Sequence, residues 1–203
     1  MTTKFLVALT LLAGAVQAQT VTGKAFGTYV NAPGVTSQSP IATLPSTGGM
    51  ATGQADAFGV AGAVDAQALN AVTTGVADNK KSGAQSTSEL EQVSAAGGAI
   101  TADVVTAVAT AYFGQFTGGS DGEGSGFANL AVNGQTITTE VAPNTQVDLP
   151  GVGYAILNEQ LQTGNGLTSY GITVNMIHVV LQDALGLTTG EIIIGSASSS
   201  VAR

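Results

Sequence analysis

The sequence predicts an all-β fold, a β-sandwich of jelly-roll-like type that follows an N-terminal signal peptide. Hydrophobic residues make up 44% of the chain and charged residues only 9%, and there are 28 glycines. A chain so apolar and so poor in charge does not have the composition of a disordered protein. β-Branched residues favour pleated sheet, and turn pairs such as Asn133-Gly134 separate the apolar runs. Closely spaced strands with turns between them are typical of sandwiches and barrels.

The first 18 residues are predicted to be a secretory signal peptide. Lys4 precedes an apolar run from Phe5 to Val16, and Val16 and Ala18 occupy the −3 and −1 positions of a small-residue cleavage site. The apolar run is shorter than the roughly 20 residues that a membrane-spanning helix needs. Cleavage after Ala18 leaves one β-rich domain, residues 19–203. We therefore expect a secreted, extracellular protein with no membrane span in the mature chain.

The first part of the mature chain is predicted to be a strand followed by a loop. Phe26, Thr28 and Val30 alternate along one face, and Asn31–Gly34 reads as a turn. Residues Thr36–Gly53 contain two prolines with several glycines, serines and threonines. This composition indicates a loop, or short strands interrupted by proline.

The segment Leu44–Gly48, "LPSTG", matches the pattern at which bacterial sortases cut surface proteins. A sortase signal works at the C-terminus, ahead of an apolar span and a basic tail, and this segment lies near the N-terminus. We interpret it as a loop in which Pro45 fixes φ and Gly48-Gly49 allow positive φ.

A weak internal repeat relates Ala61–Thr74 to Gly97–Thr110 at an offset of 36 residues. Two equivalent hairpin arms in one sheet would explain it, and so would a β-solenoid-like section at 61–113. The charged stretch between the copies indicates an exposed connection with one helical turn near Ser88–Val93. The glycine-rich stretch Gly118–Phe127 indicates a flexible loop.

The C-terminal third contains the clearest strand pattern. Hairpin turns are predicted at Asn133-Gly134 and Pro150-Gly151, and a buried strand is predicted near the end of the chain. The stretch "YGITVNMIHVVLQD" reads as one long strand. Strict alternation places the following side chains on one face of it: Ile172, Val174, Met176, His178 and Val180.

Charge and cysteine content exclude several classes of function. The formal net charge is −8, and the five basic residues cannot form a patch that follows a phosphate backbone, so we expect no nucleic-acid partner. There is no cysteine, so stability must come from sheet packing rather than from disulfides.

The sequence offers few groups for catalysis or metal binding. His178 is the only histidine, no serine lies in a G-x-S-x-G motif, and we expect His178 to be a structural residue in a sheet. Asp121 and Glu123 are weak calcium candidates, because their loop lacks the full D-x-[DN]-x-[DN]-G pattern. We predict no catalytic residue and no cofactor.

The chain resembles the bacterial choice-of-anchor P family. The resemblance rests on "GKAFGTYVN", the Leu-Pro-x-Thr-Gly-Gly segment, "GGAITADVVTAVATA" and the order "VNGQTI…PNTQVDLPGVGYAILNEQ…ITVNMIHVVL…GEIIIGSASSSV". It covers roughly Val21–Val201. The resemblance implies secretion and a place at the cell surface, and none of its motifs is catalytic. This chain departs from the pattern in that no C-terminal sorting motif follows Ile194.

Three functions follow as hypotheses. The first is a non-enzymatic structural protein of the cell surface or extracellular matrix, noncovalently associated, that binds itself through sheet edges or binds other surface components. The second is an adhesin or ligand-binding module that uses exposed loops such as Asn31–Gly53 or Gly118–Gly126. The third is a hydrolase that uses His178.

Overall fold

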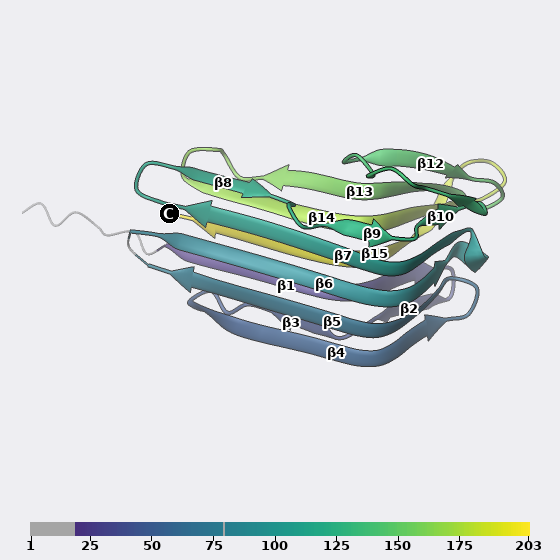
Figure 1. Ribbon diagram of the computed structural model, residues 1–203, viewed down its shortest axis with the longest axis horizontal. Coiled ribbons are helices and arrows are strands. Elements are labelled where there is room, and N and C mark those ends of the chain that lie inside the picture. Colours follow the sequence, from purple (N-terminus) through teal and green to yellow (C-terminus); the bar gives the residue numbers. More distant parts are fainter. Residues whose placement is uncertain (1–18, 79) are drawn as a thin grey trace, which may run out of the picture.

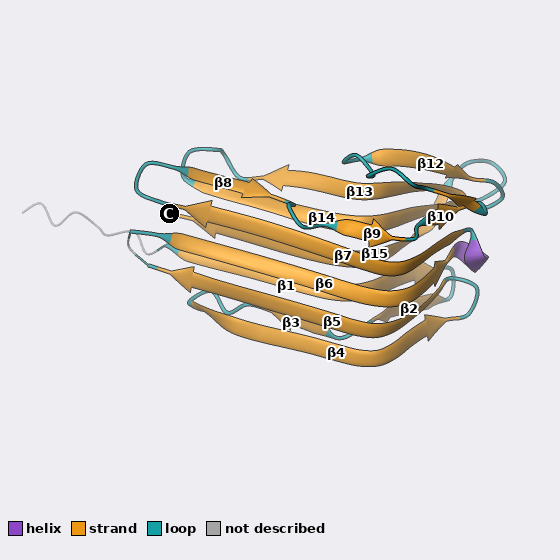
Figure 2. Ribbon diagram, in the orientation of Figure 1, coloured by secondary structure: helices purple, strands orange, loops and turns teal. Residues whose placement is uncertain are grey.

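The computed structural model describes residues 19–78 and 80–203, and the predicted signal peptide lies outside them. The described chain is all-β and forms two antiparallel sheets, as the sequence predicts (Figures 1 and 2). It contains one short 3₁₀ turn, Ala96–Gly98, and no helix in this part of the chain is long and apolar enough to cross a membrane.

Sheet A has the strand order β12-β13-β14-β15-β1-β2, and β3 also pairs with β1. Its first and last strands in the sequence are neighbours, since Thr20 of β1 lies opposite Ala202 of β15. Its strands are β1 (Thr20–Ala32), β2 (Val35–Gln38), β3 (Ile41–Thr43), β12 (Thr145–Leu149), β13 (Gly153–Thr163), β14 (Ser169–Gln182) and β15 (Thr188–Ala202).

Sheet B has the order β11-β10-β7-β6-β5-β4, with β8 and β9 also paired to β7. Four long consecutive strands make a meander, and the short strands follow along its far edge. Its strands are β4 (Gly48–Val60), β5 (Val64–Ala77), β6 (Ser82–Ala95), β7 (Ile100–Phe113), β8 (Gly118–Asp121), β9 (Gly126–Ala128), β10 (Ala131–Val132) and β11 (Gln135–Thr136).

The internal repeat corresponds to two equivalent strands. β5 and β7 begin and end 36 residues apart and lie on either side of β6, both antiparallel to it. The hairpin-arm interpretation is confirmed, and the solenoid-like alternative is wrong because consecutive strands run antiparallel. The exposed connection predicted between the copies is also wrong, because Ser82–Ala95 is the central strand β6. Three of the inward side chains in its first half are serines, Ser82, Ser86 and Ser88, so this half lacks the apolar signal of a buried strand.

The predicted turns are found where the sequence placed them, whereas the predicted loops are partly strands. Asn133 and Gly134 both have positive φ, as a two-residue hairpin requires, and Gly151 has a φ of 77° after Pro150. The flexible loop expected at 118–127 instead contains β8 and β9, which pair with β7. Residues 36–53 contain β2, β3 and the start of β4, in agreement with the alternative of short interrupted strands.

The sortase-like segment is anchored to the core by its first residue, while Pro45, Ser46 and Thr47 are exposed. Leu44 is 4% exposed and packs with Val21 and Phe113, while Gly48 and Gly49 both have positive φ. The loop interpretation is confirmed.

A line of irregular residues crosses the four longest strands of sheet B. Along each strand, inward-facing side chains recur at every second residue except at one place, where they are three apart. Two consecutive residues then face outward there, for example Glu91 and Gln92 of β6. The inward pairs that flank the line are Ala55 and Phe58, Ala66 and Leu69, Leu90 and Val93, and Ala102 and Val105.

The same line continues through sheet A with the opposite pattern. There two consecutive residues face the core, as Met176 and Ile177 do in β14. Gly195 of β15 and Asn158 of β13, both with positive φ, lie beside Met176. The outer face of sheet B and the inner face of sheet A point in the same direction. The two sheets therefore turn in the same sense. Figure 1 shows β4, β5, β6 and β7 turning together in their right-hand third.

Because of this turn, the faces predicted for β14 and β1 are each wrong in part. In β14, Ile172, Val174 and Met176 face the core as expected, but His178 and Val180 face outward. In β1 the expected face is wrong in part, because Thr28 and Val30 are completely buried whereas Phe26 lies outward beneath Lys24. Strict alternation fails where the backbone leaves the extended conformation, and four strands show this as a positive φ, at Ala68, Gln92, Asn158 and Gly195.

The two sheets approach each other closely where serine and alanine fill the interior. The hydroxyl of Ser86 donates to the carbonyl of Ser198 at 2.7 Å, and that of Ser88 donates to the carbonyl of Phe26 at 2.8 Å. These bonds join sheet B directly to the backbone of sheet A. Small side chains at these positions are therefore required by the sheet spacing, since sheets packed through larger residues lie about 10 Å apart.

Two hydroxyls of this interior have no hydrogen-bond partner among the described residues, Thr28 Oγ1 and Thr73 Oγ1. A buried hydroxyl without a partner carries a desolvation cost. We expect Thr73→Val to raise the free energy of unfolding by about 1 kcal/mol. Urea denaturation measures it, with Thr74→Val, an exposed neighbour on the outer face, as the control. Equal effects of both substitutions would contradict the interpretation.

Candidate functional site

His178 lies on the outer face of sheet A within a cluster of polar side chains. The turn of β14 brings it out of the core, and antiparallel pairing sets β13 and β15 on either side. The cluster consists of Glu159 from β13, Asn175 and His178 from β14, and Glu191 and Ser196 from β15.

The imidazole of His178 bridges two carboxylates. Nδ1 lies 3.1 Å from both carboxylate oxygens of Glu159, and Nε2 lies 3.1 Å from Oε2 of Glu191. The amide of Asn175 donates to Glu159 at 2.7 Å and accepts from the hydroxyl of Ser196 at 2.7 Å. The result is one continuous network across three strands.

The network is well shielded although no layer covers this face. Glu159, Asn175 and Ser196 are 7%, 6% and 4% exposed, so neighbouring side chains cover one another where the strands turn. A shallow hollow of about 420 Å³ adjoins His178 and Glu191. The cluster therefore combines low solvent exposure with direct access to one side of the imidazole.

The two carboxylates favour the charged imidazole. The hydrogen bond that the His178 imidazole donates to Glu159 raises the pKa of His178 above its usual 6.5, against the opposing effect of burial. The same hydrogen bond lowers the pKa of Glu159 below its usual 4.5, with a further contribution from Asn175. Both shifts favour the pair of a charged imidazolium and a charged carboxylate over the neutral pair.

This geometry is suited to joining strands rather than to moving a proton. A general base needs a ring nitrogen free to take a proton from a nucleophile. Both nitrogens of His178 are directed at carboxylates, and the hydroxyl of Ser196 reaches Asn175 instead. The structural role expected for His178 stays a prediction, and the structure places the side chain at the surface instead of in the core.

The stabilising effect of the cluster is expected to depend on pH. The raised pKa of His178 means that its contribution is complete below about pH 6.5 and is lost as the pH rises through the raised value. The lowered pKa of Glu159 means that its contribution is complete above about pH 4.5 and is lost as the pH falls through the lowered value.

We therefore expect His178→Gln to destabilise most between about pH 4.5 and 6.5, by about 1 kcal/mol for a partly screened pair. Denaturation curves of both proteins from pH 4 to pH 9 measure the difference. The curves should converge at the alkaline end. A difference in the free energy of unfolding that stays constant over the whole pH range would contradict the assignment of the charged imidazole.

The sequence interpretation missed the partners of His178. None of Glu159, Asn175, Glu191 and Ser196 stands out by motif. Pairing β13 with β14 around the connection at residues 164–168 would have placed Glu159 beside Asn175, which is their register in the structure. The contact to His178 depends on the turn of β14, which no sequence pattern indicates.

Asp121 and Glu123 lie at the end of β8 and in the following turn. Asp121 accepts a hydrogen bond from the backbone N–H of Glu123 at 3.1 Å, so this carboxylate stabilises its own turn. Within residues 19–78 and 80–203, no three residues of the His, Cys, Asp and Glu types gather in a way that could hold a metal ion. The calcium assignment stays a weak prediction.

A larger hollow of about 550 Å³ lies between the two sheets at their open side. Met176 and Asn158 of sheet A line it from within, and residues 136–141, which lead from sheet B to sheet A, form its rim. Phe127, Leu130 and Ile137 give it an apolar surface beside threonine and asparagine side chains. Its size and mixed lining are within the range of small-molecule sites.

Comparison of the chain with protein-family models, with curated proteins and with solved structures finds no match.

Proposed function

We propose that the protein is a secreted, non-enzymatic structural component of the cell surface or extracellular matrix and that it associates with itself through a sheet edge. The observation that carries this proposal is the edge strand β4. It is 13 residues long and, within residues 19–78 and 80–203, pairs only with β5, so the backbone groups on its other side are free to pair. It contains one charged residue, Asp56, and neither lysine nor proline.

Natural edge strands are usually protected by charge, proline, a bulge or short length. β4 carries the shared turn near Asp56 but has no other such feature. The outer face beside it is also uniform, since Thr52, Val72, Thr87 and Val108 form one cross-strand row. A flat row of β-branched side chains continues readily into an added strand.

A second copy of β4 fits this edge without charge conflict. Antiparallel pairing about a two-fold axis at Gln54 places Asp56 of each copy opposite Thr52 of the other. The pairing would join two copies of sheet B into one continuous sheet. The predicted signal peptide and the resemblance to choice-of-anchor P proteins support an extracellular setting for such an assembly.

Lysine on the edge tests this contact. We expect the double variant Thr52→Lys, Gln54→Lys to weaken lateral association, measured as weight-average mass by sedimentation equilibrium. The matched control is Gln85→Lys, Thr87→Lys, which adds the same charge to the outer face of the central strand β6. If the β4 variant associates laterally as strongly as the control variant does, the edge proposal is wrong.

Export is tested separately. We expect expression in a secreting bacterial host to deliver protein that begins at Gln19 to the medium or the cell surface, as read by N-terminal sequencing. Retention of the full-length chain inside the cell would contradict the secreted location.

The 550 Å³ hollow favours ligand binding as a second candidate. Its apolar lining and polar rim would suit a small molecule with an apolar body and a hydroxyl or amine group. Thermal-shift screening with such compounds tests it, and Ile137→Trp should abolish any hit by narrowing the hollow. A hit that this variant leaves unchanged would place the ligand elsewhere.

A further inference from the structure

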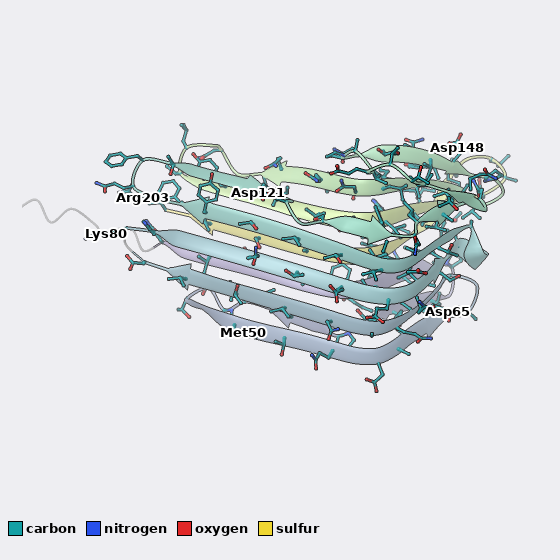
Figure 3. All side chains as sticks on the ribbon, viewed as in Figure 1. Met50, Asp65, Lys80, Asp121, Asp148 and Arg203 are labelled. Atoms are coloured by element: carbon teal, nitrogen blue, oxygen red, sulfur yellow. The ribbon has the colours of Figure 1, made fainter. Side chains whose placement is uncertain are left out.

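Charge is segregated between the two ends of the sandwich. The long strands run about 45 Å from end to end at 13 or 14 residues each. Figure 3 shows Lys80 and Arg203 at one end and Asp65 and Asp148 at the other. Segregation of this kind along the strand axis gives the molecule two electrostatically different ends.

All lysine and arginine residues that the structure describes lie at or near one end. Lys80 and Lys81 occupy the β5–β6 connection, and Arg203 packs over Phe113 beside them at the end of β7. Lys24 lies a short way along β1. We call the surface formed by Lys80, Lys81, Arg203 and the loop 164–168 the basic end. Asp78 is the single carboxylate side chain in its loops, and it accepts the N–H of Lys80.

The opposite end is acidic. We call the surface formed by Asp148, Asp183 and the loop 183–187 the acidic end. Most other carboxylates lie at or beyond the turn of the strands, on the same side of the molecule. They are Asp56, Asp65, Glu91, Asp103, Glu140, Glu159 and Glu191.

Each end also presents large apolar side chains to solvent. Leu167 is 77% exposed at the basic end, and Phe116 is 89% exposed in the neighbouring β7–β8 connection. Leu185 and Leu187 are 84% and 63% exposed at the acidic end. An exposed large hydrophobic residue is ordinary when it occurs singly, but here such residues gather on both charged ends.

Loop structure fixes these side chains in place. At the basic end, Oδ1 of Asn165 accepts the backbone N–H groups of Leu167, Thr168 and Ser169. At the acidic end, Oδ1 of Asp183 accepts those of Leu185 and Leu187. Both loops therefore hold their leucines outward without needing to order on binding, which lowers the entropic cost of an association.

The acidic end has a hollow that suits a basic side chain. It measures about 420 Å³ and lies between the β12–β13 turn and the β14–β15 connection. Asp148 and Asp183 both line it, and the Asp148 side chain is exposed with none of its oxygens in a hydrogen bond within the described residues. A lysine or arginine placed there would meet two carboxylates.

We propose that the basic end of one copy binds the acidic end of the next, so that the protein forms head-to-tail chains along its strand axis. The leucines of the two ends form the apolar centre of the contact, and the Lys80-Lys81 pair faces Asp148 and Asp183 around it. The contact is heterologous, so it propagates unless its rotation closes a ring. This inference rests on the proposed structural function and adds to the lateral β4 contact a longitudinal one.

Salt dependence is the first test. Sedimentation velocity of the purified protein should show the weight-average sedimentation coefficient rising with concentration in about 20 mM NaCl, and this rise should be largely lost in about 500 mM NaCl. Association that is unaffected by salt would overturn the end-to-end contact, since charges exposed at a rim are screened under these conditions.

Charge reversal is the sharper test. The double variant Lys80→Glu, Lys81→Glu makes both ends acidic. The variant Asp148→Lys lowers the negative charge of the acidic end. Each variant alone is expected to weaken end-to-end association by about tenfold or more. Mixing the two variants should restore pairing, because each supplies the end that the other has lost. Glu89→Lys, which changes the net charge as Asp148→Lys does but lies between the ends on β6, is the control and should associate like the wild-type protein.

The two contacts fail in distinguishable ways. Mixed variants that do not pair, together with wild-type association abolished by Thr52→Lys, Gln54→Lys, would overturn the end contact and leave the β4 proposal standing. Pairing of the wild-type protein only with an added polycation, and never with itself, would show that the acidic end serves another basic partner and would overturn self-association. A wild-type protein that is monomeric under all conditions would overturn both.

Discussion

Gly195→Ala is expected to lower the free energy of unfolding by about 3 kcal/mol. Gly195 has a φ of 64°, in the left-handed region where a side chain costs about 1–2 kcal/mol. A Cβ atom there would lie 2.9 Å from Cγ1 of Val105 and 3.3 Å from Cβ of Met176. Both neighbours are completely buried, so overpacking adds about 1–3 kcal/mol.

Gly83→Ala is the matched control for this prediction. Gly83 lies in the central strand β6 without a positive φ, and the nearest atom to an added Cβ is 3.9 Å away. Alanine should be tolerated there, with a small gain from reduced freedom of the unfolded chain. A Gly195→Ala protein as stable as Gly83→Ala in urea would mean that the shared turn of the two sheets does not require its glycine.

Ser199→Val should destabilise the protein by about 2–3 kcal/mol, the second largest effect expected. Oγ of Ser199 lies 2.8 Å from the carbonyl oxygen of Ala109 and 3.0 Å from Oγ of Ser86, in a completely buried position. Valine removes these contacts between the sheets. It also adds volume where the sheets approach through serine and alanine.

Ser200→Val tests whether the effect depends on the interior. Ser200 is the next residue of β15 but faces outward, where its hydroxyl lies 2.7 Å from that of Thr22. Valine is favoured on a half-exposed strand surface, so we expect a change within about 0.5 kcal/mol. Thermal denaturation of the two variants should separate them clearly, and equal shifts would argue against a narrow, hydrogen-bonded interior.

The fold class was accessible from the sequence because composition and turn chemistry act locally. Asn133-Gly134 and Pro150-Gly151 adopt the backbone that their side chains favour, and β5 and β7 repeat one pattern at one spacing. The strand β6 could not be predicted from the sequence. Its inward serines satisfy their hydroxyls on the backbone of the opposite sheet, and that partner cannot be identified from β6 alone.

The candidate site was even harder to predict from the sequence. His178 is conspicuous as the only histidine, but its environment depends on the turn of β14 and on strands 19 and 13 residues away in sequence. Alternation placed it in the core because every residue was assumed to be extended. Positive φ at Asn158 and Gly195, on the two neighbouring strands, marks the place where that assumption fails.

Both proposed contacts require the protein to bind copies of itself through surfaces built on a rigid sandwich. Small-angle X-ray scattering across a concentration series tests this requirement most directly, because particle length and cross-section are obtained from the same curves. We expect the particle length to grow with concentration at low salt and the cross-section to grow only while the β4 edge is intact. Scattering that fits a single sandwich at every concentration and salt would contradict it.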